Sequence, residues 1–101
     1  MSAYIIVYRE SPVRDEAAIA EYSRRNQANA AAWREDTGIQ PLVAYGGIEA
    51  LEGDAPDGIV LLRFPTMEQA RAWYNSPEYQ EALGFRLKAA EWRVVLVEGL
   101  A

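Results

Sequence analysis

The stretch Phe64–Leu83, FPTMEQARAWYNSPEYQEAL, decides the fold because it joins the end of a strand to a punctuated helical region. Thr66 and Gln69 fit a capping box, in which the two side chains satisfy free backbone donors at a helix start. Ser76-Pro77 then restarts the helix, since serine caps an N-terminus and proline suits the first helical position. The stretch therefore predicts a helical region in two segments, directly after a strand.

The same stretch is dense in aromatic and polar side chains, which is consistent with a ligand site or with two helical segments that bury rings at a corner. We interpret Trp73 and Tyr79 first as core anchors with a polar tip. Ser76 is interpreted as a cap and not as a nucleophile, because the chain has no histidine to act as its base.

Four segments rich in β-branched and aromatic residues predict strands. They are Ala3–Arg9, Leu42–Leu51, Gly58–Phe64 and Trp92–Val97. The pair Gly46-Gly47 inside the second segment predicts a bulge or a close backbone approach. The second and third strands are expected to form a hairpin.

A long helix is expected from a cap at Asp15 to about Asp36, with Thr37-Gly38 as its stop. Its apolar stripe is expected at Ile19, Tyr22, Asn26, Ala30 and Trp33. In the second helical region the apolar face is expected at Tyr79, Leu83, Leu87 and Ala90. The order is β-α-β-β-α-β, which predicts an α+β, ferredoxin-like domain over residues 1–101: a four-stranded antiparallel sheet with two helices on one face.

Both faces of this predicted sheet are apolar. In the first strand Tyr4, Ile6 and Tyr8 lie on one side, and Ile5 and Val7 on the other. Helices cover only one face, and an uncovered second face would exceed the apolar patch that monomers tolerate. We therefore expect a homodimer with two-fold symmetry, formed through the sheet faces. The alternative is a monomer with an exposed apolar sheet.

The charges argue against several kinds of partner. The chain has 101 residues and a net charge of −5, and its nine arginines and one lysine form no cluster. This balance argues against nucleic acid and anionic membranes, both of which need a basic surface. The start lacks a basic signal-peptide region, no apolar run is long enough for a membrane span, and cysteine is absent, so a cytoplasmic protein is expected.

The absence of histidine removes the usual general base and the usual ligand of zinc, copper and haem. The acidic segment Glu52–Gly58, EGDAPDG, lacks the spacing of a calcium loop and is interpreted as a solvated hairpin loop. The sequence therefore predicts neither a metal site nor a cofactor.

Four segments together resemble one known family: AYIIVY at 3–8, YGGIEALEGD at 45–54, FPTMEQARAWYNSPEYQEAL at 64–83 and RVVLVEG at 93–99. The chain is similar to the domain-of-unknown-function 1330 family of the dimeric α/β-barrel superfamily. The resemblance implies a fold and a dimer, in agreement with the argument from the apolar faces, but it implies no reaction. Asp36–Pro41, DTGIQP, departs from the family pattern.

In the folds that the resemblance implies, a ligand cleft lies between the sheet and the helices. The candidate ligand-binding residues for that space are Tyr8, Glu49, Glu52, Arg63, Trp73 and Tyr79. Arg63 is expected either to pair with one of the two glutamates or to bind an anionic group of a ligand.

Three functions are compatible with the sequence. The first is a small-molecule-binding or cofactor-free enzymatic dimer for a modest aromatic or carboxylate-bearing compound, with Arg63 as anchor and Tyr8 or a glutamate as proton donor or acceptor. The second is a ligand-sensing or interaction module without catalysis, and the third is a structural dimer. A cavity of several hundred Å³ lined by Arg63, Tyr8 and Trp73 favours the first two, whereas a filled core with Arg63 paired to a glutamate favours the third.

Overall fold

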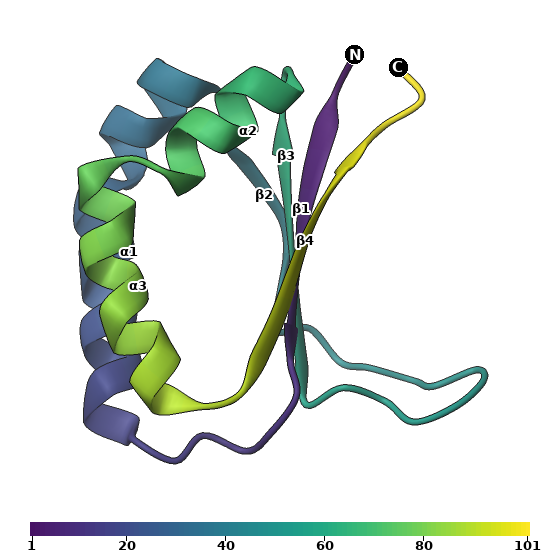
Figure 1. Cartoon of the computed structure of the whole chain (residues 1–101). Coiled ribbons are helices and arrows are strands. Elements are labelled where there is room, and N and C mark those ends of the chain that lie inside the picture. The colour runs from purple at the N-terminus through teal and green to yellow at the C-terminus, as the bar shows by residue number, and fades with distance from the viewer.

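Seven elements make up the fold of the computed structural model, which describes residues 1–101. They are β1 (Ala3–Arg9), α1 (Glu16–Thr37), β2 (Gln40–Ala44), β3 (Gly58–Phe64), α2 (Met67–Tyr74), α3 (Pro77–Ala89) and β4 (Trp92–Glu98). The strands form one antiparallel sheet in the order β2-β3-β1-β4, and all helices lie on one of its faces (Figure 1). The expected count of two helices is wrong, because the second helical region is divided into α2 and α3.

The helix ends follow the residues that mark them in the sequence. The Asp15 carboxylate accepts a hydrogen bond from the backbone N–H of Ala18 at 2.9 Å, which begins α1. Gly38 ends α1 in the left-handed conformation, with φ at 70°. Thr66 Oγ1 accepts from the Gln69 N–H at 3.1 Å, and the Ser76 hydroxyl accepts from the Tyr79 N–H at 3.3 Å. The three predicted N-cap residues are confirmed, but the Gln69 side chain accepts from the Thr66 hydroxyl at 3.2 Å instead of bonding the Thr66 backbone, so the capping box is not reciprocal.

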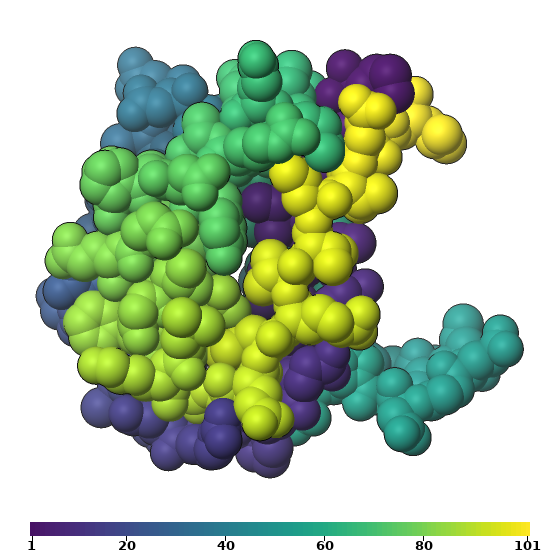
Figure 2. Space-filling view, in the orientation of Figure 1, coloured from purple at the N-terminus to yellow at the C-terminus, as the bar shows by residue number.

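The second strand is shorter than expected, because β2 ends at Ala44. Tyr45 adopts φ of 57° and donates its N–H to Ile59 O at 2.9 Å, after which the chain turns away from the sheet. Gly46-Gly47 therefore lie beyond the strand, and the register shift falls earlier, between Pro41 and Val43. Residues 46–57, called the arm below, project on the side opposite the helices (Figures 1 and 2).

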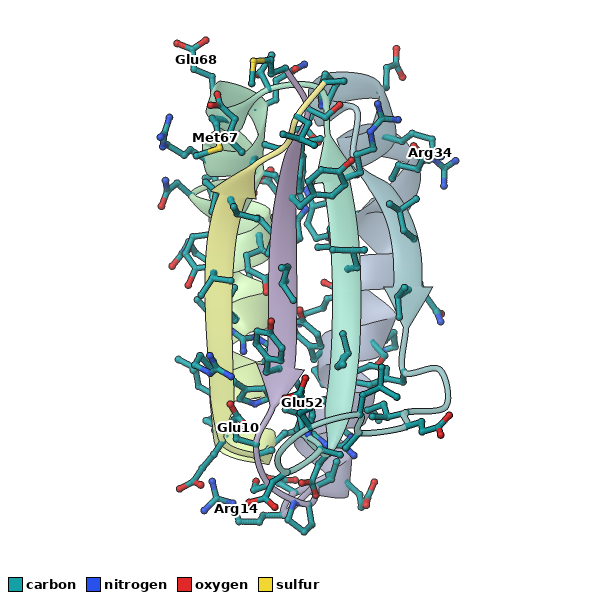
Figure 3. All side chains as sticks on the ribbon, turned by 90° about the vertical axis from the view of Figure 1, so that its right-hand side faces the viewer. Glu10, Arg14, Arg34, Glu52, Met67 and Glu68 are labelled. Atoms are coloured by element: carbon teal, nitrogen blue, oxygen red, sulfur yellow. The ribbon has the colours of Figure 1, made fainter.

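The sheet has one face covered by helices and one open face. On the covered side Ile5 lies opposite both Leu62 and Leu96, and β1 buries Ala3, Ile5 and Val7. The open face, which points toward the viewer in Figure 3, carries side chains that are half-buried or exposed. Its residues are Tyr4, Ile6, Tyr8, Val43, Ile59, Leu61, Arg63, Arg93, Val95 and Val97. The prediction of apolar side chains on both faces is confirmed.

The buried face of α3 differs from the prediction at one position. Tyr79, Leu83 and Ala90 are buried as expected, but Leu87 is 60% exposed. The preceding residue, Arg86, takes the buried position and is only 3% exposed. Arg86 lies seven residues after Tyr79, which is two helical turns and therefore the same face. A charged side chain thus occupies a position in the interior of the molecule.

Candidate ligand-binding site

A cavity of about 370 Å³ lies between the covered face of the sheet and the helices. The sheet contributes an apolar floor, and the helices contribute aromatic and polar side chains opposite it. The floor is made of Ile5, Val7, Val60, Leu62 and Val94, from β1, β3 and β4. Alternate residues of a strand point to the same side of the sheet. The register places Ile5 opposite Leu62 and Val7 opposite Val60 and Val94, so these side chains share one face, the face that the helices cover. The strand pattern therefore builds one wall of the site.

The helices close the cavity with a cluster of aromatic rings. The rings of Trp73 and Tyr79 have centroids 4.0 Å apart, and the Trp33 ring packs edge-on against Trp73 at 5.7 Å. Phe64 contacts Trp73 from the end of β3, with 5.6 Å between centroids. Such ring pairs stabilise a fold beyond the area that they bury. The cluster holds the α2–α3 junction against α1 and gives the cavity a rigid aromatic wall.

Two hydroxyl groups meet at this wall. Tyr22, from α1, and Tyr79, from α3, share a hydrogen bond of 2.9 Å between their phenol oxygens. Tyr79 is 2% exposed, and burial raises the pKa of its phenol above the usual value for tyrosine, with the nearby Tyr22 contributing in the same direction. Tyr79 therefore stays protonated over the physiological range.

Several polar groups around the cavity have no hydrogen-bond partner. Asn26 lies one helical turn after Tyr22, and its Oδ1 is buried and unpaired. The indole N–H groups of Trp33 and Trp73 are buried and unpaired as well. Arg86 lines the cavity with two unpaired guanidinium nitrogens, Nε and Nη1. Buried polar groups in folded proteins are nearly always paired, so this concentration of unpaired groups is unusual for a protein interior.

Tyr45 forms part of the cavity rim from the end of β2. Its left-handed backbone is unfavourable for a residue with a side chain. Its ring packs over Gly58, where an added Cβ would lie 2.8 Å from the Tyr45 Cδ1, and the Arg9 guanidinium lies 5.6 Å from the ring centre. The strained residue at the rim is thus held by its neighbours on β1 and β3.

A second hollow of about 280 Å³ adjoins the cavity at the edge of the sheet. It lies between α2 and β4, and it shares Ile5, Tyr74 and Val94 with the main cavity. Arg71 and Asn75 line it from the helix side. Figure 2 shows the surface hollowed between the helices, in green, and β4, in yellow. This edge provides a route from solvent toward the central cavity.

The structure brings together only part of the predicted site. Trp73 and Tyr79 line the cavity, as expected for residues that face the space between helices and sheet. Tyr8 lies on the open face, where the Arg93 guanidinium stacks 4.3 Å from its ring centre. Arg63 also lies on the open face and donates to Ser2 Oγ, at 2.9 Å from Nη2. The expectation that Tyr8 and Arg63 point into the cleft is wrong, because both occupy the opposite parity of their strands.

The two predicted glutamates lie away from the cavity as well. Glu49 and Glu52 are exposed residues of the arm, and neither forms a salt bridge with Arg63. Figure 3 places Glu52 in front of the lower end of the sheet, on its open side. The early end of β2 explains the difference, since the chain has left the sheet before it reaches these residues.

Sequence reasoning missed the polar residues of the cavity. The sequence predicts Tyr22 and Asn26 in the apolar stripe of α1 and indicates no role for Arg86 or Tyr45. A signal for Arg86 exists in its spacing, because it falls on the helical face defined by Tyr79 and Leu83. No group of three or more acidic side chains lies close enough together to hold a metal ion. None of the three helices combines the length with the apolar character that a membrane span needs.

Fold and cavity together define an α+β protein of ferredoxin-like architecture with a ligand-sized internal site. The chain belongs to DUF1330, a family described as a domain of unknown function, whose model matches residues 2–100. The predicted family resemblance is confirmed. No curated protein sequence matches the chain significantly.

Solved structures with the same fold have low sequence identity to the chain. A dimeric ferredoxin-like protein of unknown function from Jannaschia sp. CCS1 has a TM-score of 0.74 at 16% identity, over 98% of this chain and 100% of the other. A protein of unknown function from Rhodopseudomonas palustris has a TM-score of 0.71 at 15% identity, over 99% and 83%. A putative antibiotic biosynthesis monooxygenase from Nitrosomonas europaea has a TM-score of 0.62 at 14% identity, over 98% and 90%. These likenesses establish the fold.

Proposed function

We propose that the protein binds a small organic molecule in the cavity between the sheet and the helices. The observation that carries the proposal is a cavity of about 370 Å³ whose wall is mainly apolar and aromatic but includes unpaired polar groups. Ligand sites in proteins have this size and this composition, with a few polar groups that orient the ligand. A purely structural domain gains nothing from such a cavity, because empty interior volume lowers stability.

Two further points support this function over a purely structural dimer. A filled core with Arg63 paired to a glutamate would favour the structural dimer, and neither feature is present. A fold neighbour from Nitrosomonas europaea is named as a putative monooxygenase, so this architecture is compatible with small-molecule chemistry. An enzyme and a non-catalytic ligand sensor would use the same cavity, and assays for turnover of a bound compound separate them.

Calorimetric titration with 2-naphthoate and its neutral amide, 2-naphthamide, tests the cavity as a binding site. Ala30 lines the cavity, whereas Ala31 is the next residue on α1 and is exposed. We expect Ala30→Leu to fill part of the space and to weaken binding at least tenfold, while Ala31→Leu leaves it unchanged. Absence of binding by both compounds, or equal affinity in the two variants, contradicts the proposal.

We also propose that the protein forms a homodimer through its open face. The face carries apolar side chains from all four strands, and Val95 and Val97 are 39% and 47% exposed in the single chain. Patches of this kind in soluble proteins mark interfaces. The fold neighbours from Jannaschia and from Bacteroides fragilis are described as dimeric proteins with a ferredoxin-like fold, which supports a dimer. Sedimentation equilibrium at micromolar concentration is expected to give twice the chain mass, and the mass of a single chain contradicts the proposal.

A further inference from the structure

Arg86 is a buried cation without a carboxylate partner. Its side chain is 3% exposed, and arginine is almost never buried this deeply unless it is paired. The four ion pairs of the protein use Arg24, Arg25 and Arg93. The Nε and Nη1 atoms of Arg86 are buried and donate to no acceptor. The fold thus keeps a guanidinium inside the molecule without supplying its counter-charge.

The surroundings of Arg86 hold the side chain in place but leave its Nε and Nη1 atoms without an acceptor. The guanidinium carbon lies 5.1 Å from the centre of the Trp92 ring, and the Trp92 indole donates to the Arg86 backbone oxygen at 2.9 Å. Arg86 is in the last turn of α3, where the helix dipole favours a positive charge. Both interactions stabilise the cation, yet neither provides a hydrogen-bond acceptor for Nε or Nη1.

The charge of the cavity wall has one sign. Two arginines, Arg34 and Arg86, line the cavity, and no aspartate or glutamate does. The chain as a whole carries a net charge of −5, so a wall without a single carboxylate is not a consequence of composition. The buried donors without partners on Trp33, Trp73 and Arg86 outnumber the one acceptor without a partner, Asn26 Oδ1. The site lacks negative charge, and its unpaired donors outnumber its unpaired acceptors.

We infer that the cavity binds a small monoanion, a carboxylate on an apolar or aromatic body, with the Arg86 guanidinium as its counter-charge. A carboxylate supplies two acceptor oxygens to the fork of an arginine, and the apolar body lies against the sheet floor and the aromatic rings. This inference rests on the proposed function and specifies the ligand class. It assigns to Arg86 the anchoring role that the sequence suggested for Arg63.

The difference in affinity between 2-naphthoate and 2-naphthamide tests the inference in the unmodified protein. The two compounds match in shape, and only the carboxylate is charged at pH 7.5. We expect calorimetry to show 2-naphthoate bound at least tenfold more tightly, the effect of one charged hydrogen-bonded contact. Equal affinity overturns the anion inference and leaves cavity binding intact, whereas failure of both compounds to bind overturns the proposed function as well.

Two variants of Arg86 and one matched control assign the charge to this residue. Arg86→Met removes the cation and keeps an unbranched chain. It is expected to lower the affinity for 2-naphthoate about ten- to hundredfold, with little effect on the affinity for 2-naphthamide. Arg86→Lys keeps the charge without the planar fork and is expected to retain part of the preference. Lys88→Met makes the same change of net charge on an exposed position of α3 and is expected to change neither affinity. A variant Arg86→Met that keeps the full preference for the acid overturns the assignment.

Discussion

At the scale of single residues, Arg86 differs from a structural arginine in what its removal does to the fold. Removing one partner of a buried ion pair leaves the other charge unpaired and is strongly destabilising. Arg86 has no ionic partner to leave behind, and the burial of its Nε and Nη1 atoms without hydrogen-bond acceptors is unfavourable. Its retention inside the molecule is therefore better explained by binding than by stability.

A first prediction concerns the stability of the Arg86→Met variant. The substitution replaces a desolvated cation with an apolar side chain, so we expect the free energy of unfolding to rise by about 1 kcal/mol. Urea denaturation followed by circular dichroism measures the change. Loss of several kcal/mol would instead show that Arg86 is a structural residue, in conflict with a role as ligand anchor.

A second prediction uses the buried phenol of Tyr79. Burial raises the pKa of Tyr79 in the folded protein, so the folded state holds this proton more tightly than the unfolded chain. The contribution of Tyr79 to the free energy of unfolding is therefore fully present below about pH 10, the pKa of tyrosine in an unfolded chain. Above that pH the free energy of unfolding falls with a slope set by the proton that the unfolded chain loses. Urea titrations at pH 9, 10 and 11 measure this slope. In Tyr79→Phe the slope should be smaller by up to about 1.4 kcal/mol per pH unit, and an unchanged slope contradicts the assignment.

At the scale of elements, the glycines in and after the helices give predictions of opposite sign. Gly38 ends α1 with φ of 70°, and an added Cβ would lie 2.7 Å from Pro65 Cγ. Gly38→Ala is therefore expected to lower the free energy of unfolding by about 2 kcal/mol. Gly84 lies inside α3 at an exposed position where an added Cβ meets no atom within 4 Å, so Gly84→Ala is expected to raise it by about 1 kcal/mol. Thermal and urea unfolding of the two variants test the pair, and changes of equal sign contradict the helix-end geometry.

The element boundaries were predictable where the chain carries local signals. Asp15, Thr66, Ser76 and Gly38 mark helix ends through contacts with residues at most four positions away, and such contacts are readable from sequence. The end of β2 depends instead on the left-handed backbone of Tyr45, a residue type that does not favour this conformation. The packing of its ring over Gly58 supports it, and that contact joins positions distant in the chain.

The candidate site was predictable only in its aromatic part. Trp73 and Tyr79 follow from the helical region that carries them, whereas the placement of Tyr8 and Arg63 depends on which parity of a strand faces the helices. When both faces are apolar, alternation in the sequence does not show which face is covered. The burial of Arg86 is hard to predict because the neighbouring Leu87 is apolar and also fits the buried face of the helix. For Arg86, the spacing from Tyr79 and Leu83 along the helix is thus a better guide to burial than the charge of its side chain.

At the scale of the whole molecule, the cavity and the open face lie on opposite sides of one sheet. The cavity uses one set of alternate residues of β1, β3 and β4, and the proposed dimer interface uses the other set. The arm projects on the open side, and it carries apolar residues at Ile48 and Leu51, of which Leu51 is 88% exposed. The arm therefore points into the space that a second copy would occupy in the proposed dimer (Figure 1).

The open face provides the last prediction, a charge placed on the proposed interface. Val97→Glu introduces a carboxylate on the open face of β4, and two-fold symmetry places two such charges in one interface that must desolvate them. We expect the dissociation constant of the dimer, measured by sedimentation velocity, to rise at least a hundredfold. Leu87→Glu is the matched control, because Leu87 is likewise exposed and apolar but lies on the outer surface of α3. The control should sediment as the unmodified protein does. If both variants dissociate alike, or if Val97→Glu remains a dimer, the interface does not lie on the open face of the sheet.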